Sequence, residues 1–208
     1  MIKKFFSFSA VVILTTICVH AQLSFGVQAG LTGTDMSIIH DGEYSFSTMK
    51  TEMILGYQVG VVMDLKNKDL LGMSGFQTGL FVMSQGYEFR NEKVNSTYIQ
   101  APMDFRFHLG SKKITFLQIG WYFSFPVSGI VTYDINGTKE IRDIKFGKDD
   151  DAYLKSFDSG FRIGGGWDFD IVQIVLNVNS GIRDLSKKKN IEMTNMSMSA
   201  SIVYLFGW

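Results

Sequence analysis

The chain has 208 residues, and its 20 Lys and Arg balance 20 Asp and Glu, so the formal net charge is zero. This length suggests a single domain, and the lack of a basic excess argues against a nucleic-acid partner. Aromatic residues make up 14% of the chain, and 21 glycines accompany only 2 prolines. Such a composition favours many short β-strands over helices.

The first residues have the pattern of a signal peptide. Lys3 and Lys4 precede an apolar or small run over 5–19, and Val19-His20-Ala21 resembles a cleavage site. The alternative, a membrane helix, needs about 20 apolar residues, and this run is shorter. We therefore expect residues 1–21 to be removed on export.

The predicted mature chain, 22–208, would form one domain without cysteine. Cys18 is the only cysteine and lies in the segment that we expect to be removed. A lipid anchor at Cys18 is the other reading, but Ile17 stands where a small residue is expected. A mature chain without cysteine excludes disulfides and thiolate metal sites.

Eight segments alternate apolar and polar residues with period 2, which is the pattern of strands with one apolar face. In chain order they lie at 23–31, 55–65, 76–83, 98–110, 117–125, 157–169, 173–183 and 196–206. Their lengths are close to the about 9–11 residues of a membrane-spanning strand. Short turns near 67–68, 110–112 and 170 alternate with long connections at 32–53, 87–97, 126–155 and 184–194. This predicts an all-β fold, an eight-stranded antiparallel up-and-down transmembrane β-barrel with periplasmic turns and termini and long extracellular loops.

Alternation alone also fits a soluble barrel, which would turn its apolar face inward. The polar positions separate the two possibilities, because they hold Gly, Ser, Gln, Asn, Asp and Arg but no Lys or Glu. A face exposed to water is normally rich in Lys and Glu. We therefore expect the polar face to line the lumen and the apolar face to contact lipid, with aromatic side chains at the membrane interfaces.

Seven polar residues are candidates for a charged cluster inside the lumen. They are Asp104, Arg106, His108, Asp158, Arg162, Asp168 and Arg183. One interpretation is a pore lining or a small ligand site, and the other is a salt-bridged plug that fills the lumen. Eight strands leave room for little more than packed side chains, so the plug is favoured.

The sequence predicts no catalytic residue, cofactor or metal. His40 and His108, the histidines of the mature chain, fall at opposite ends of the predicted barrel, so a Ser/His/Asp site is hard to assemble. The run 149–151 is acidic and could bind a cation, although a solvated loop is the simpler interpretation. In "YDINGTKEI", Asn136-Gly137 predicts a β-hairpin within 126–155.

Two further features concern strand ends and interruptions. Tyr204, Phe206 and Trp208 share one face of the last strand, which resembles the C-terminal signal read by the barrel-insertion machinery. Pro102 lies inside a predicted strand of a barrel that has no edge, and proline cannot donate to the ladder. A bulge or a locally missing hydrogen bond is expected there.

The ordered pieces "FGVQAGL", "LGYQVGVVMDL", "FQTGLFVMSQGYEF", "YIQAPMDFRFHLG", "FLQIGWYFSF" and "FDSGFRIGGGWDF" resemble the PorT-like outer-membrane β-barrel family of Bacteroidetes-type bacteria. The fourth piece is similar to that family's Y-L-E-I-P-L-x-x-K strand, with Gln100 in place of the usual acid and Arg106 where that family often has a base. The resemblance implies an outer-membrane location and a link to a secretion and gliding apparatus.

The function expected from these patterns is that of a non-enzymatic outer-membrane barrel. Its role would be in envelope structure, in adhesion, or as a partner of an assembly or secretion apparatus. The alternatives are a narrow channel or ligand-transport barrel and, third, an outer-membrane enzyme. The expected partners are the lipid bilayer, the barrel-insertion machinery and other envelope proteins.

Overall fold

The computed structural model describes most of the predicted mature chain. The described residues are 22–42, 45–49, 51–66, 75–89, 92–110, 114–135, 138–147, 154–186 and 191–206. The predicted signal peptide at 1–21, the acidic run 149–151, the turn at 136–137 and the terminal Trp208 lie outside them. No helix in the described ranges is long and apolar enough to cross a membrane.

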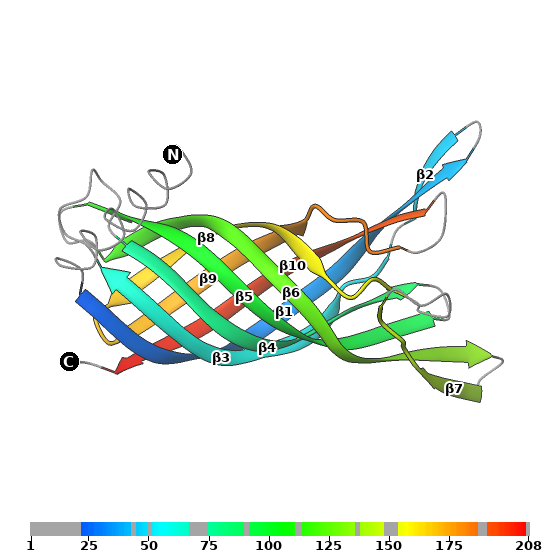
Figure 1. Cartoon of the computed structure of the whole chain (residues 1–208), viewed down its shortest axis with the longest axis horizontal. Coiled ribbons are helices and arrows are strands. Elements are labelled where there is room, and N and C mark those ends of the chain that lie inside the picture. The colour runs from blue at the N-terminus through cyan, green and yellow to red at the C-terminus, as the bar shows by residue number, and fades with distance from the viewer. Residues whose placement is uncertain are drawn as a thin grey trace, which may run out of the picture.

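Ten strands in the described part of the chain form one sheet that closes into a barrel (Figure 1). They are β1 (Gln22–Gly42), β2 (Ser45–Met49), β3 (Ile54–Lys66), β4 (Gly75–Phe89), β5 (Glu92–Leu109), β6 (Thr115–Ile135), β7 (Thr138–Asp143), β8 (Asp158–Phe169), β9 (Val172–Gly181) and β10 (Ile191–Phe206). Eight of them follow the order β10-β9-β8-β6-β5-β4-β3-β1, and antiparallel pairing of β10 with β1 closes the ring. The predicted eight-stranded antiparallel barrel is therefore confirmed.

The two ends of the barrel differ. At one end, on the left of Figure 1, β1 begins, β10 ends and the short connections from β5 to β6 and from β8 to β9 lie. We call this the turn end and the opposite one the loop end. At the loop end β2 pairs antiparallel with the last residues of β1, and β7 pairs with β6 in a hairpin that projects from the barrel (Figure 1). The hairpin predicted within 126–155 is thus present.

The register of the ladders sets the width of the barrel. A row of paired residues starts at Asp158 in β8 and returns to β8 at Asp168, ten positions further along the strand. The row passes through Ser124, Gln100, Phe81, Gly60, Gln28, Val203 and Gln173. With strands about 4.8 Å apart and about 3.3 Å of rise per residue, eight strands and this offset give a tilt of about 40° and a radius of about 8 Å. Side chains from opposite walls of so narrow a barrel meet in the middle.

The two faces of the wall have the predicted orientation. From Met196 to Phe206 in β10 every second residue is exposed, and the residues between them, three serines followed by Val203 and Leu205, are buried. Leu55 is 84% exposed and Ile163 is 61% exposed, whereas Gln28 and Asn177 are 2% and 3% exposed. The outer surface is therefore a continuous apolar belt, which suits lipid and not water.

Exposed aromatic side chains lie toward both ends of that belt. One group is near the turn end, at Phe25, Trp167, Phe169, Tyr204 and Phe206. The other is nearer the loop end, at Tyr57, Trp121, Phe123, Phe125 and Phe161. This is the arrangement expected of the two aromatic girdles of a membrane barrel.

The strands extend further at the loop end than the sequence predicted. The expected long connection 87–97 is instead a hairpin, because β4 and β5 stay paired up to Phe89 and Glu92. Likewise β1 does not end near Leu31 but pairs with β10 as far as His40. Backbone pairing continues because the inner face changes there from polar to apolar side chains, which pack together. The buried residues of this apolar cluster are Met36, Ile38, Tyr87, Val94, Val131, Ile144, Leu154, Leu185 and Met193.

Both prolines of the chain coincide with irregular pairing. Pairs between β4 and β5 are present at Met103 and at Gln100 but interrupted between them, at Ala101 and Pro102, without a change of register. The hydrogen bond predicted to be missing at Pro102 is therefore missing from this ladder, and the Thr78 hydroxyl donates to the Pro102 carbonyl at 2.7 Å. Pro126 stands where the β5–β6 register shifts by one residue, next to Val127.

The outward orientation of the apolar face predicts a position-dependent effect of charge. Val59, midway along β3, and Ile141, in the projecting β7, are both at least half exposed. Val59→Arg is expected to lower the free energy of unfolding in lipid vesicles by about 2–4 kcal/mol, because the guanidinium would enter hydrocarbon. Ile141→Arg, the matched control outside the belt, is expected to change it by less than about 0.5 kcal/mol. Equal effects in a denaturant titration would contradict a lipid-facing belt.

Candidate functional site

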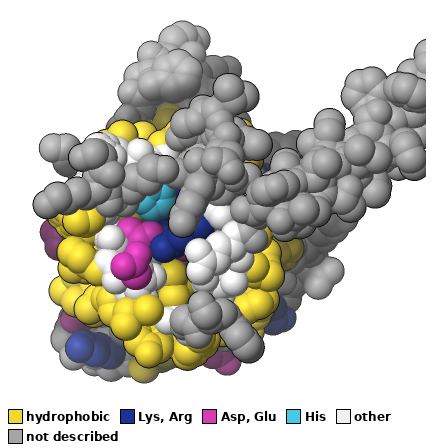
Figure 2. Space-filling view, turned by 90° about the vertical axis from the view of Figure 1, so that its left-hand side faces the viewer, with side chains coloured by type: hydrophobic (Ala, Val, Ile, Leu, Met, Phe, Trp, Pro, Cys, Tyr) yellow, Lys and Arg dark blue, Asp and Glu magenta, His cyan; other side chains and the backbone are white. Residues whose placement is uncertain are grey.

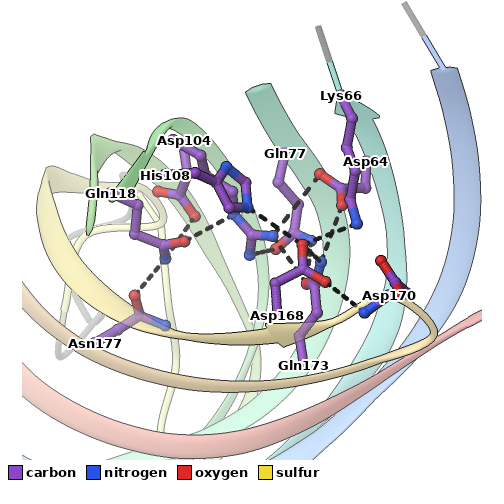
Figure 3. Close-up of polar contacts among 11 residues, drawn as sticks. Asp64, Lys66, Gln77, Asp104, His108, Gln118, Asp168, Asp170, Gln173 and Asn177 are labelled. Carbon is purple, nitrogen blue, oxygen red and sulfur yellow. Dashed lines mark hydrogen bonds and ion pairs between the residues drawn. The ribbon is translucent and has the colours of Figure 1, made fainter. Parts of the chain in front are cut away.

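Arg106 is the centre of the polar lumen toward the turn end. It is fully buried, and its guanidinium donates to three glutamine side chains from three other strands, which are labelled in Figure 3. The bonds run to Gln118 at 3.0 Å, to Gln173 at 2.8 Å and to Gln77. A fully buried guanidinium is tolerated only when its donors are satisfied in this way.

Arg106 also has electrostatic partners above and beside it. Its Nη1 lies 3.7 Å from a carboxylate oxygen of Asp64 in β3, and its guanidinium carbon lies 4.4 Å from the centre of the Phe116 ring. Gln173 links the pair further, because its amide nitrogen donates to Asp64 at 3.0 Å. The network therefore ties β3, β4, β5, β6 and β9 together across the lumen.

Asp168 is a second junction, at the mouth of the turn end. Its carboxylate lies 2.8 Å from the ammonium of Lys66 and 3.2 Å from Nε2 of His108. The amide of Gln173 donates to it at 3.2 Å, and the backbone N–H of Asp170 at 3.0 Å. Figure 2, which faces the turn end, shows acidic, basic and imidazole side chains gathered there within a ring of hydrophobic ones.

Asp104 and Arg162 form the next pair toward the middle of the lumen. Arg162 Nε lies 3.2 Å from the Asp104 carboxylate, and both side chains are buried. The amide of Gln118 donates to the same carboxylate at 3.4 Å and contacts the Asn177 amide at 2.5 Å (Figure 3). This pair is joined through Gln118 to the Arg106 network.

Asp158 lies apart from these pairs, at the loop-end start of β8. It accepts hydrogen bonds from the Tyr122 hydroxyl at 3.3 Å and from the Asn195 amide at 2.9 Å. Asn195 also donates to Gln85 at 3.3 Å. A second polar layer thus crosses the lumen just below the apolar cluster of the loop end.

Arg183 does not project into the lumen, contrary to the prediction, although its charge acts on Asp158 from outside it. β9 ends at Gly181, so the alternation that would have turned Arg183 inward no longer applies. The Arg183 side chain is exposed, and its guanidinium lies 4.9 Å from the centre of the Phe157 ring. The other six predicted residues do face the lumen, in three separate layers.

The lumen also holds functional residues that the sequence analysis did not single out. Asp64 and the glutamines Gln77, Gln118 and Gln173 supply most of the partners of Arg106, and Lys66, expected in a turn, reaches the mouth. Two signals in the sequence could have identified them. They occupy the alternate strand positions that face inward, and a buried arginine needs several hydrogen-bond acceptors. In chemical terms the site is a set of ion pairs and hydrogen-bonded amides, in which one oxygen each of Asp64, Asp104 and Asp158 has no hydrogen-bond partner in the part of the chain that the structure describes. No group of three or more His, Cys, Asp and Glu side chains suited to a metal occurs among the described residues.

The loop end is tied by a surface ion pair over the apolar cluster. Lys155 Nζ lies 2.7 Å from the carboxylate of Asp184, joining the segment after β7 to the segment after β9. Partial burial acts to raise the pKa of Asp184, but hydrogen bonds from Lys155 and from the backbone N–H groups of Met193 and Ser186 outweigh it and lower the pKa.

A closed barrel with an apolar outer wall and a polar, ion-paired interior defines an integral membrane β-barrel protein. The chain belongs to the family described as outer membrane protein beta-barrel domain, whose model matches residues 20–187. No curated protein matches the chain significantly.

Solved structures of bacterial surface barrels are similar to this one. The crystal structure of Neisserial surface protein A (NspA) matches with a TM-score of 0.51 at 13% identity, covering 89% of this chain and 99% of that one. Ail, the attachment invasion locus protein of Yersinia pestis, crystallised with the heparin analogue sucrose octasulfate, matches with a TM-score of 0.44 at 11% identity, covering 89% of this chain and 99% of that one. At these identities the likeness to NspA establishes the fold alone.

The Arg106 network predicts a large and specific loss of stability. Arg106→Met leaves Asp64 without its counter-charge and three glutamine oxygens without their donor, so we expect a loss of about 3–5 kcal/mol in unfolding free energy. The double variant Arg106→Met/Asp64→Asn should recover part of it, since the uncompensated charge is gone. Arg142→Met, which removes an exposed pair with Glu140, should cost less than about 1 kcal/mol. An Arg106→Met loss no larger than that of Arg142→Met would contradict the network.

The lowered pKa of Asp184 predicts a pH-dependent closure at the loop end. Because the folded pKa lies below the unfolded value of about 4, the stabilisation is complete above that value and is lost as pH falls through the folded pKa. Both partners are more than a third exposed, so the effect should stay below about 1 kcal/mol. Hydrogen exchange at the Leu185 amide, which bonds to Met193 O, should speed up below about pH 4 relative to its intrinsic rate. In Asp184→Asn this additional dependence should be absent, and its persistence would contradict the tether.

Proposed function

We propose that the protein is a non-enzymatic outer-membrane barrel that holds a rigid β-sheet extension outside the membrane, for contact with other envelope components or with surfaces. The observation that carries this proposal is the filling of the lumen at successive levels. From the turn end upward, it is filled by the Asp168 and Arg106 networks, by the Asp104–Arg162 pair, by the Asp158 layer and by the apolar cluster.

The orientation in this proposal follows from the connections. Outer-membrane barrels keep short turns in the periplasm and longer segments outside. By that rule, the turn end with the start of β1 and the end of β10 faces the periplasm, and the loop end faces the medium. The likeness in fold to NspA, which is described as a surface protein, supports exposure of the loop end.

The loop end has the construction of a contact surface and not of loose loops. Paired strands β4 and β5, and β1 and β10, continue beyond the aromatic side chains of the belt, and the apolar cluster fixes them from inside. The β6–β7 hairpin carries mostly exposed side chains, among them Lys139, Ile141 and Asp143. A preorganised surface of this kind loses little conformational entropy on binding a partner.

Export and assembly complete the proposal. Residues 1–21 serve as the cleavable signal peptide, and the last strand serves as the signal for the insertion machinery. Tyr204 and Phe206 lie on one outward face of β10, each about half exposed, where such machinery can reach them. Membership of the PorT-like group, with a partner in a secretion apparatus, is the narrower form of the same proposal.

Transport and catalysis receive less support from the lumen. A path for solutes would require the buried Arg106 side chain to leave three glutamine acceptors and the Asp64 carboxylate. His108 is engaged with Asp168 at the turn end, while the backbone of His40 pairs with Ile191 at the loop end. The two histidines therefore stand at opposite ends, which leaves no acid–base pair of histidines at one rim.

The filled lumen predicts the absence of conductance. Inserted into planar lipid bilayers in about 1 M KCl, the purified barrel should show no discrete steps of current, because side chains fill the lumen at the Arg106 layer. An open porin in the same bilayers is the positive control. Reproducible steps in the wild type that vanish on charge reversal at Arg162 would contradict the proposal and favour the channel.

A further inference from the structure

Asp158 differs from the other three aspartates of the lumen in its counter-charges. Asp64 has Arg106, Asp104 has Arg162 and Asp168 has Lys66, each within 4.0 Å. Asp158 is fully buried, and no Lys or Arg of the described residues lies within that distance of it. The nearest charge that acts on it is that of Arg183, which is exposed and lies over the Phe157 ring. Since a carboxylate in a low-dielectric interior is costly without a counter-charge in direct contact, this position is suited to a bound positive charge.

One oxygen of Asp158 is free to receive it. The hydroxyl of Tyr122 and the amide of Asn195 both donate to Oδ2. Oδ1 is buried and has no hydrogen-bond partner in the structure. These two donors and the backbone N–H of Ser159 hold the carboxylate in place.

Two neighbouring side chains have the same property. Gln100 in β5, Ser124 in β6 and Asp158 in β8 are successive partners in one cross-strand row, and all three are buried. The Gln100 amide nitrogen and the Ser124 hydroxyl oxygen also lack a partner. Directly opposed side chains start about 4.5–5.5 Å apart, which holds for Gln100 with Ser124 and for Ser124 with Asp158. Gln100 and Asp158, two strands apart at about 10 Å, flank Ser124 on the inner face of the wall. The unpartnered nitrogen of Gln100 is a donor, so a cation here requires a half-turn of the amide that brings its oxygen to the site.

We propose that Asp158, Ser124 and Gln100 bind a monovalent alkali cation inside the barrel, held by Asp158 Oδ1, Ser124 Oγ and the Gln100 amide oxygen. One carboxylate neutralises one positive charge, whereas divalent calcium sites draw on several carboxylates. Carboxylate, hydroxyl and amide oxygens are the ligands that hard cations take in place of water.

The surroundings retain the cation. Above the row, the apolar cluster around Met36, Tyr87 and Met193 separates it from the loop-end solvent. Below it, Arg162 is engaged with Asp104. The cation would thus neutralise Asp158 near the loop end, as Arg106 neutralises Asp64 near the turn end. This inference concerns a site inside the wall and is independent of what the loop end contacts.

The test compares unfolding midpoints of the full barrel in NaCl, KCl and choline chloride at equal ionic strength and pH. The expected result is a midpoint that rises with the concentration of at least one alkali cation and saturates, as binding to the folded state alone requires. Choline, too large for the site, should give no such rise. Asp158→Asn should abolish the dependence, and Asp184→Asn, which removes an exposed carboxylate, should keep it.

A second variant and a direct measurement close the test. If Asp158→Asn does not fold, Ser124→Ala should still fold and should raise the cation concentration at half effect by about tenfold, one ligand having been lost. Crystals or oriented samples soaked with Rb⁺ should show it beside Asp158. Identical midpoints in alkali and choline salts, or a dependence that survives Asp158→Asn, would overturn the proposal. So would an Asp158→Asn barrel as stable as the wild type in every salt, which would mean that the carboxyl carries a proton instead.

Discussion

The pairing of β1 with β10 is the constraint on which the structure depends. It closes the sheet, so that no open strand edge is left in the hydrocarbon. Closure of eight strands with an offset of ten residues also fixes a radius of about 8 Å. From that width follow the filled lumen and the requirement that inward side chains be small, pack in apolar clusters or hydrogen-bond to one another.

The polar side chains of the lumen are buried from water, so they must form hydrogen bonds and ion pairs with one another. Arg106 is satisfied by three glutamines and Asp64, and Asp168 by Lys66 and His108. These pairs hold strands that are far apart in the chain, which links the interior chemistry to the register of the wall. Asp158 has no such partner within ion-pair distance among the described residues, and a bound cation would supply the missing positive charge. The same packing leaves the loop end as the part of the molecule free to meet partners.

Much of the fold could be predicted from the sequence, because period-2 alternation is a direct readout of a wall with two different faces. The absence of Lys and Glu from the polar face predicted which side is inward, and Asp104, Arg106 and Arg162 were placed correctly for that reason. Arg183 was misplaced because alternation says nothing once a strand has ended. The extension of β1, β4 and β5 was missed because their inner face becomes apolar there, which removes the alternation that marked the strand. Partners such as Gln77 and Gln173 depend on register between strands distant in sequence, which alternation does not encode.

The central claim, a closed wall around a filled polar interior, is tested most directly by single-cysteine labelling in lipid vesicles. Cys18, the only cysteine of the chain, lies in the predicted signal peptide, so the mature barrel offers a clean background. Cysteines placed at Ser199 and Gln100, both buried in the lumen, should stay unreactive toward a small water-soluble thiol reagent, while one at Asp143 in the exposed β7 should react rapidly. Rapid labelling of the two lumen positions in the folded protein would contradict the account.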